Sequence, residues 1–357
     1  MTPNHPQRPG RLSRPTLLPG LARLWRDPHT LQLGTDPAHA VLLELAHPAL
    51  AQLLDLLDGS RPIRTVLDTA GRLGVPREQA GQLFDTLAAH GLIVGAHTLF
   101  PSDLPEAARP RLTAEATALA LRRRELAATP AQILRRRAYA RVVLTGRGRL
   151  ARPLAVALAE AGIGHVALDL DEPQPVRDAV ARALDQAVPG TVTAPVRGTR
   201  ATLVVLLGTD RPANLLAASY ARRRQAHLLV DIRDRTPVVG PLVPAAGSPC
   251  LNCLDLHRRD RDPGWPQLAA QLCALGPAVT CDTTTLLAAA SVGAAEVLTF
   301  VDGGRPETIG TALEVHAPAR LRRRAWSAHQ DCHCQRQRQP RRGVSHPQGG
   351  VTVRDRR

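Results

Sequence analysis

The 357-residue chain contains no lysine, so all 46 of its basic residues are arginine, and only 2% of its residues are aromatic. So few aromatic side chains argue against a groove that stacks nucleic-acid bases. No apolar run approaches the roughly 20 residues that a membrane-spanning helix needs. No apolar stretch follows the first basic residues, so we expect no secretory signal and a cytoplasmic protein without a membrane partner.

The net charge of +15 is concentrated in the two ends of the sequence. Residues 1–14 carry +3 and residues 320–357 carry +9, which leaves +3 for everything between them. We therefore predict a disordered basic arm over residues 1–18 and a disordered basic tail over residues 336–357. A nearly neutral body lacks the basic surface that binds nucleic acid, so we expect no such partner.

Residues 19–100 have the pattern of a small domain with both strands and helices. Short strand-like segments come first, and the helical segments that follow each end near a glycine, namely Gly59, Gly74 and Gly91. Three strands followed by three helices predict a small α+β winged helix-turn-helix domain. Residues 101–137 have helical spacing and are expected to form a connecting helix.

Residues 138–335 change to an alternation of strands and helices. The wholly apolar Val142–Leu144 is typical of a buried parallel strand, and a glycine turn and a helix follow it. Further apolar strands alternate with helices after it. This order predicts an α/β domain with a Rossmann-like, doubly wound sheet.

The glycine turn is the first candidate binding site. Gly146 and Gly148 stand between a strand and a helix, with the small Ala151 three residues later. Such a turn brings backbone N–H groups at a helix N-terminus close to a phosphate. Asp169, 23 residues after Gly146, is placed to bind a ribose. A turn of this type over an empty pocket is the alternative.

Four of the six cysteines form two close pairs, Cys250 with Cys253 and Cys332 with Cys334. Four thiolates suit tetrahedral Zn²⁺, and the long gap between the pairs would tie the end of the domain back to its sheet. His329 or His333 is an alternative ligand. Two unrelated reduced pairs are the other interpretation.

The remaining two cysteines have separate roles. Cys273 is a candidate nucleophile, since a thiolate attacks activated acyl groups. Alternatively, Cys273 packs as a small hydrophobic residue, as lone cysteines often do. We expect Cys281 to lie in the core.

These motifs together resemble the ThiF/MoeB family of ubiquitin-activating-enzyme-like adenylyltransferases, over about residues 138–335. The resemblance implies a ThiF-type NAD/FAD-binding fold in which the glycine turn, Asp169 and Asp171 hold ATP. It further implies that Asp210 helps to bind Mg²⁺ and that the four paired cysteines hold a structural zinc. In that family an acyl-carrying cysteine lies in the segment that Gln271–Pro277 resembles, and the sheet domain often forms a homodimer.

The sequence departs from the family pattern where the phosphates should bind. The segment after Asp171 lacks the family's Asn-Leu-x-Arg motif, and Leu215 stands where an arginine normally follows Asp210. The lysine that the family uses near the phosphates is absent as well. Adenylyl transfer depends on cations aimed at developing negative charge, and loss of one donor costs roughly 3 kcal/mol.

The N-terminal domain resembles a PqqD-type recognition element, which binds the leader of a ribosomally made precursor peptide as an added strand. Such an element fused to a ThiF-like domain is similar to the partner proteins of azoline-forming cyclodehydratases, in which a separate YcaO enzyme uses the ATP. The leading hypothesis is a leader-binding protein that presents the peptide to such an enzyme. The alternatives are an ATP·Mg²⁺-dependent adenylyltransferase acting on a C-terminal carboxylate, and a winged-helix DNA-binding protein.

Overall fold

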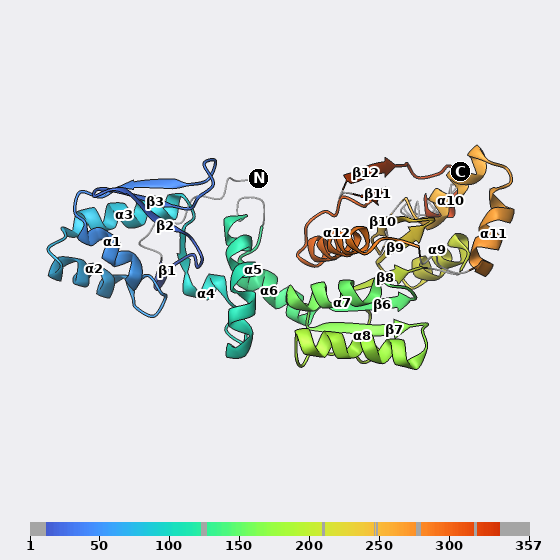
Figure 1. Ribbon diagram of the computed structural model, residues 1–357, viewed down its shortest axis with the longest axis horizontal. Coiled ribbons are helices and arrows are strands. Elements are labelled where there is room, and N and C mark those ends of the chain that lie inside the picture. Colours follow the sequence, from blue (N-terminus) through green and yellow to red (C-terminus); the bar gives the residue numbers. More distant parts are fainter. Residues whose placement is uncertain are drawn as a thin grey trace, which may run out of the picture. The chain divides into compact units, whose positions relative to one another are not determined.

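The computed structural model describes residues 12–122, 127–208, 211–245, 247, 249–275, 280–317 and 320–335 (Figure 1). The chain forms two compact units. The first unit comprises residues 1–144, 149–202 and 290–305, and the second comprises residues 145–148, 203–289 and 306–357. Asp210 and the predicted tail at 336–357 lie outside the described residues.

An antiparallel sheet and three helices form the N-terminal part of the first unit. The buried and exposed residues of β3 and β4 alternate, so one face of the sheet joins a core with α1–α3, which lie below the strands in Figure 1. The elements are β2 (Arg23–Asp27), β3 (Thr30–Leu33), β4 (Val41–Glu44), α1 (Ala49–Leu53), η2 (Leu54–Leu56), α2 (Ile63–Arg72) and α3 (Arg77–Ala89).

The structure corrects the predicted arm at residues 1–18. Strand β1 (Pro15–Leu17) pairs antiparallel with β5 (Ile93–Gly95), and Leu12, Leu17 and Leu18 are buried. The burial of these leucines fixes the segment, although its proline and arginine content is typical of disorder. Residues 1–11 lie outside the described part.

The connecting segment contains separate helices, where the sequence analysis expected one. After α4 (Ala96–Leu99) and η3 (Glu106–Ala108) come α5 (Arg109–Leu121) and α6 (Pro130–Tyr139). Helix α6 begins with a capping box, in which the Thr129 side chain accepts from Gln132 N–H and the Gln132 side chain accepts from Thr129 N–H. This start signal accounts for the beginning of α6 at Pro130.

A buried arginine joins several parts of the first unit. Arg137 of α6 forms 2.7 Å ion pairs with Glu115 and Asp302, and it donates to the carbonyl oxygen of Ala161. Burial alone would lower the pKa of Arg137, but hydrogen bonds to Asp302 and Glu115 outweigh burial and raise it. The guanidinium therefore stays charged, and its partners hold α5, α6 and the end of α12 together.

A seven-stranded mixed sheet has the strand order β12-β11-β10-β9-β8-β6-β7. Strands β8 and β9 are parallel, whereas β9 through β12 pair antiparallel in sequence order. The architecture is consistent with the Rossmann-like fold predicted from the alternating pattern. Its first elements are β6 (Arg141–Gly146), α7 (Ala151–Glu160), β7 (His165–Leu170), α8 (Gln174–Ala187), β8 (Leu203–Leu207), α9 (Ala213–Arg222) and β9 (His227–Arg233).

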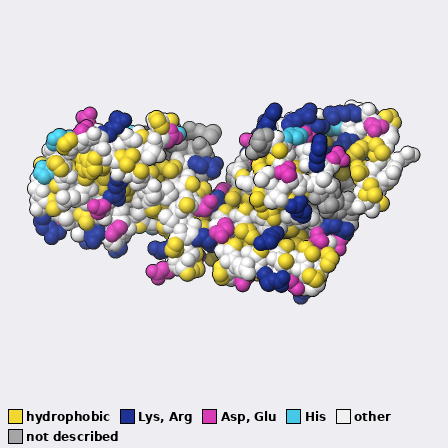
Figure 2. Space-filling model, viewed as in Figure 1, with side chains coloured by type: hydrophobic (Ala, Val, Ile, Leu, Met, Phe, Trp, Pro, Cys, Tyr) yellow, Lys and Arg dark blue, Asp and Glu magenta, His cyan; other side chains and the backbone are white. Residues whose placement is uncertain are grey.

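The later elements complete the second unit and return to the first. They are β10 (Thr236–Val243), α10 (Leu251–Arg261), α11 (Trp265–Leu275), α12 (Thr283–Val301), β11 (Thr311–His316), β12 (Arg320–Ala325) and η4 (His333–Gln335). All six residues of the edge strand β12, four of them arginines, are exposed, and dark-blue atoms gather there in Figure 2. Positive charge on an edge strand discourages pairing with other chains.

Helix α12 corrects the expectation about apolar runs. At 19 residues it is long and apolar enough to cross a membrane, alone among the helices of the described residues. The core helix of a globular protein passes the same test, and 44% of the apolar window is buried inside the molecule. Glu296 on this helix is buried.

Candidate functional site

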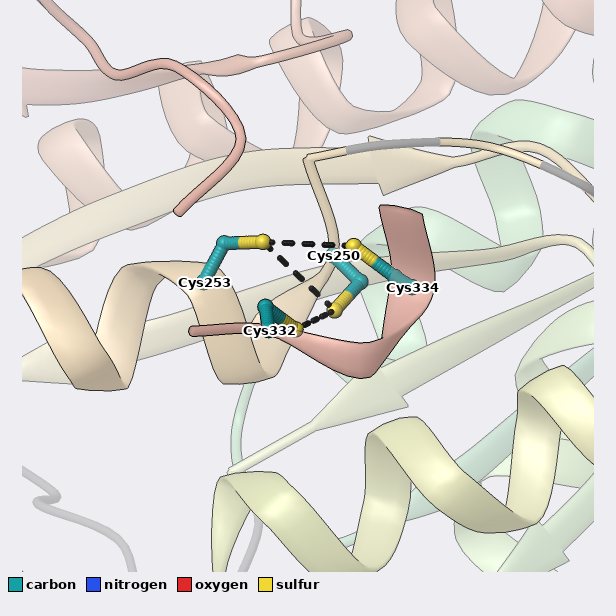
Figure 3. A group of neighbouring side chains, drawn as sticks. All are labelled: Cys250, Cys253, Cys332 and Cys334. Atoms are coloured by element: carbon teal, nitrogen blue, oxygen red, sulfur yellow. Dashed lines mark hydrogen bonds between the residues drawn. The ribbon is translucent and has the colours of Figure 1, made fainter. Parts of the chain in front are cut away.

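The four paired cysteines converge on one point of the second unit, although the two pairs are about 80 residues apart (Figure 3). Cys250 caps the N-terminus of α10, and Cys253 lies one helical turn later. Cys332 directly precedes η4, and Cys334 lies within it. The structure thus brings together the metal ligands predicted from the sequence.

The sulfur positions suit a tetrahedral metal ion. The Sγ–Sγ distances are 3.9 Å for Cys250–Cys253, 3.6 Å for Cys250–Cys332 and 3.4 Å for Cys253–Cys334. Zinc–sulfur bonds of about 2.3 Å in a regular tetrahedron place sulfurs about 3.8 Å apart. All four sulfurs lie within 4.8 Å of one another, and Cys334 alone of these residues is not fully buried. The cluster could therefore hold a metal ion.

The surroundings of the cluster favour a thiolate. The hydrogen bond between Cys250 and Cys253 lowers the pKa of Cys253 to about 4 and raises that of Cys250. The backbone N–H of His329 also donates to Cys253 and lowers its pKa. The side-chain amide of Asn252 donates to Cys332 at 3.3 Å. Donors of this kind stabilise metal-bound sulfur.

The two histidines that were alternative ligands are placed differently. His329 is buried, with Nε2 2.6 Å from Asp260 and with Nδ1 accepting from the Asp331 N–H at 3.1 Å. Both ring nitrogens are therefore engaged away from the metal position. His333 is exposed in η4. This geometry favours four sulfur ligands and gives His329 the role of fixing the C-terminal segment on α10.

The sequence analysis missed these supporting residues. Asn252 lies inside the C-x-x-C motif, where a donor to a thiolate could have been suspected. Asp260 and His329 are 69 residues apart, and no local pattern connects them.

The glycine turn is held against the end of β8. Gly146 has φ +105°, and a Cβ there would lie 2.0 Å from the carbonyl oxygen of Leu207. Arg147 N–H donates to that same oxygen at 2.9 Å. The tight turn thus requires glycine at 146, and one N–H of the candidate phosphate loop is committed to β8.

The other predicted site residues are spread over the two units. Asp169 near the end of β7 and Asp171 just after it are exposed, and both belong to the first unit. Gly146 and Gly148 belong to the second unit. Cys273 is half-buried on α11, outside the four-cysteine cluster, whereas Cys281 is buried as expected.

Comparison with known proteins finds likeness at the level of structure alone. No known family model and no curated protein sequence matches the chain. The structure is similar to that of Escherichia coli MccB with ATP, with TM-score 0.59 and 14% identity over 89% of this chain and 98% of that one. It is also similar to the microcin C7 biosynthetic enzyme MccB in complex with N-formylated MccA, with TM-score 0.56 and 14% identity.

The heterocyclase TruD is another similar structure, with TM-score 0.57 and 18% identity over 88% of this chain and 41% of that one. At such low identities the likeness establishes a shared fold. The shared fold agrees with the Rossmann-like sheet. The similarity covers most of the chain, including much of the N-terminal part.

Replacing Cys250 with serine should remove the metal and destabilise the second unit. Structural zinc contributes roughly 10–16 kcal/mol in small metal-dependent domains, and we expect a loss of several kcal/mol here. Metal content by mass spectrometry and thermal unfolding measure the two effects. Cys273→Ser, which removes a thiol outside the cluster, is the control. The metal site would be contradicted if the wild-type protein contained no metal and Cys250→Ser unfolded at the same temperature as the wild-type protein.

Gly146→Ala should destabilise the protein more than Gly148→Ala. Both positions have positive φ, so each alanine costs about 1–3 kcal/mol of backbone strain. Gly146→Ala adds a clash with Leu207, whereas a Cβ at Gly148 meets nothing within 4 Å. Urea unfolding of the two variants measures the difference, and equal losses would refute the close approach of the turn to β8.

Proposed function

We propose that the chain is a cytoplasmic, ThiF-like protein that binds the leader of a ribosomally made precursor peptide and presents it to a YcaO-type cyclodehydratase. The N-terminal part serves as the winged-helix, PqqD-like recognition element in this proposal. The cysteine cluster holds a structural zinc, and the α/β part forms a homodimer. The fold similarity to MccB, solved with MccA, and to the heterocyclase TruD supports a role in peptide natural-product biosynthesis.

The observation that carries the proposal is the exposed, apolar face of the three-stranded sheet. Leu24, Gln32 and Leu42 lie directly opposite one another on β2, β3 and β4. Leu24 and Leu42 are 45% and 50% exposed. Exposed apolar groups gathered on one sheet mark an interaction surface.

Strand β4 is the edge best suited to receive a peptide strand. Leu45 N–H donates to His29 O, which fixes the alternation of hydrogen bonds along the β3–β4 pair. The N–H and C=O groups of Leu42 and Glu44 then point away from β3, at the open edge of the sheet. At the opposite edge, the Arg23 side chain is bound to Asp55 and to the Leu54 carbonyl. A leader could therefore extend the sheet beside β4.

The phosphate site favours a role in binding over catalysis. The chain has no lysine, and Arg147 N–H is already used by Leu207. In the alternative, an adenylyltransferase, Gly146, Gly148, Asp169 and Asp171 would hold ATP and Asp210 would bind Mg²⁺. Cys273 would carry the acyl group.

Leu42→Pro should weaken leader binding at least tenfold without unfolding the protein. Proline is tolerated where an edge N–H faces solvent, and it removes a donor that an added strand needs. Fluorescein-labelled synthetic peptides from short reading frames beside the gene serve as probes in anisotropy titrations. We expect at least a tenfold loss of affinity for Leu42→Pro and a smaller one for Leu42→Ala. Equal binding by folded Leu42→Pro would reject β4 as the docking edge.

ATP–pyrophosphate exchange separates the proposal from its alternative. We expect no exchange above background, with or without the peptides, because the cations that stabilise adenylyl transfer are missing. Robust exchange that disappears in Asp210→Ala would establish the adenylyltransferase instead.

A further inference from the structure

A pocket of about 930 Å³ lies beside the cysteine cluster in the second unit. Its walls come from α9, from the start of β9, from the segment after β10 and from Cys250, Cys332 and Cys334. In Figure 3 the yellow-green helix α9 faces the cysteines from below. This volume is at the upper end of the range found for small-molecule sites.

The pocket is separate from the glycine turn. In the parallel pair β8–β9, Val204 lies opposite His227 and Leu207 lies opposite Val230. His227 lines the pocket, whereas Leu207 accepts the hydrogen bond of the glycine turn. Three residues of strand separate the two ends by about 10 Å. The pocket therefore lies at the opposite end of these strands from the candidate nucleotide site.

The pocket has two arginines in its wall, and the sulfurs of the cysteine cluster lie in another part of the same wall. Arg222 and Arg224 line it, and the described lining residues include neither Asp nor Glu. Both arginines are exposed, and within the described residues neither side chain has an ion-pair partner. Guanidinium groups of this kind bind carboxylates through paired hydrogen bonds. The two arginines are suited to an anionic group.

A buried histidine adds a second requirement. His227 is 2% exposed, and its Nδ1 lies 3.1 Å from the carbonyl oxygen of Gln225. Its Nε2 is buried without a hydrogen-bond partner among the described atoms. Burial lowers the pKa of His227 to about 4, so the ring is neutral at pH 7. With Nδ1–H donating to Gln225, Nε2 is left as an acceptor that requires a donor.

Backbone strain marks the same place. Arg224 has φ +50°, at the end of α9, where its N–H donates to Ala221 O and Gln225 N–H donates to Tyr220 O. Glycine usually takes this helix-ending position because a Cβ is unfavourable there. Strained residues of this kind cluster at binding sites. The presence of arginine rather than glycine at position 224 indicates a function for the arginine side chain.

We propose that this pocket binds a carboxylate with a neighbouring N–H group, as in an N-acylated amino acid or the C-terminal residue of a peptide. Arg222 and Arg224 pair with the carboxylate, and the N–H donates to His227 Nε2 once the wall that closes this atom from solvent has shifted. Ala217, Val243 and Ala245 form an apolar wall for the attached side chain. The site does not depend on the proposed function, because it uses neither the N-terminal sheet nor the glycine turn.

Isothermal titration of the full-length protein with matched probes tests this site. The probes are N-acetyl-L-alanine, N-acetyl-trialanine and the C-terminal amide of each. We expect both acids to bind and both amides to bind at least tenfold more weakly, because the amides lack the charge. Tighter binding of the trialanine acid identifies a peptide C-terminus as the ligand, and equal binding shows that the site recognises the N-acylated terminal residue alone.

Arg224→Gly is the decisive variant, with Arg223→Ala as its control. Arg223 is exposed and adjacent but does not line the pocket. We expect Arg224→Gly to raise the melting temperature, since glycine accepts the positive φ, and to weaken binding of the acids about tenfold. Arg223→Ala should bind normally. Failure of both acids to bind, equal binding of acids and amides, or equal effects of the two variants would overturn the proposal.

Discussion

The convergence of four sulfur atoms on one point is the constraint on which the second unit depends. Cys250 and Cys253 lie at the start of α10, and Cys332 and Cys334 follow the last strand of the sheet. Without a shared ligand, these four thiols, three of them buried, would gain little from lying so close, whereas a bound cation would make their approach favourable. The same closure positions the C-terminal segment against α10 through His329 and Asp260, and it completes one wall of the adjacent pocket.

Local geometry divides the α/β part into two ends with different chemistry. At the carboxyl end of β8, Gly146 makes a turn so close to Leu207 that no side chain fits, but part of its backbone hydrogen bonding is already satisfied. At the amino end of β9, the pocket combines free arginine charge with a neutral histidine. Among the described residues, the unpartnered Nε2 of His227 thus lies at the end of these strands away from the glycine turn. A shared fold does not by itself imply a shared binding or catalytic activity.

Several elements were predictable because their signals are local. The apolar runs of β6, β8 and β9, the helices α2 and α3 that end near glycines, and the cysteine pairs all follow from short-range patterns. Helix α8 was missed because its proline-flanked start and polar surface resemble a loop, with only Val180 and Leu184 buried. The ordered segment at 12–18 was missed because its leucines are buried by β5 and the helices, which composition does not reveal.

The sequence by itself determined the class of fold and the identity of the four cysteines, because periodicity and close spacing are properties of the chain. Tertiary structure alone decided that the two cysteine pairs meet, that His329 binds Asp260, and that Leu42 lies on an open edge. It also decided that Arg224 and His227 face one pocket with the cysteines. These contacts join residues tens of positions apart, and their geometry exists only once the strands have paired and the helices have packed.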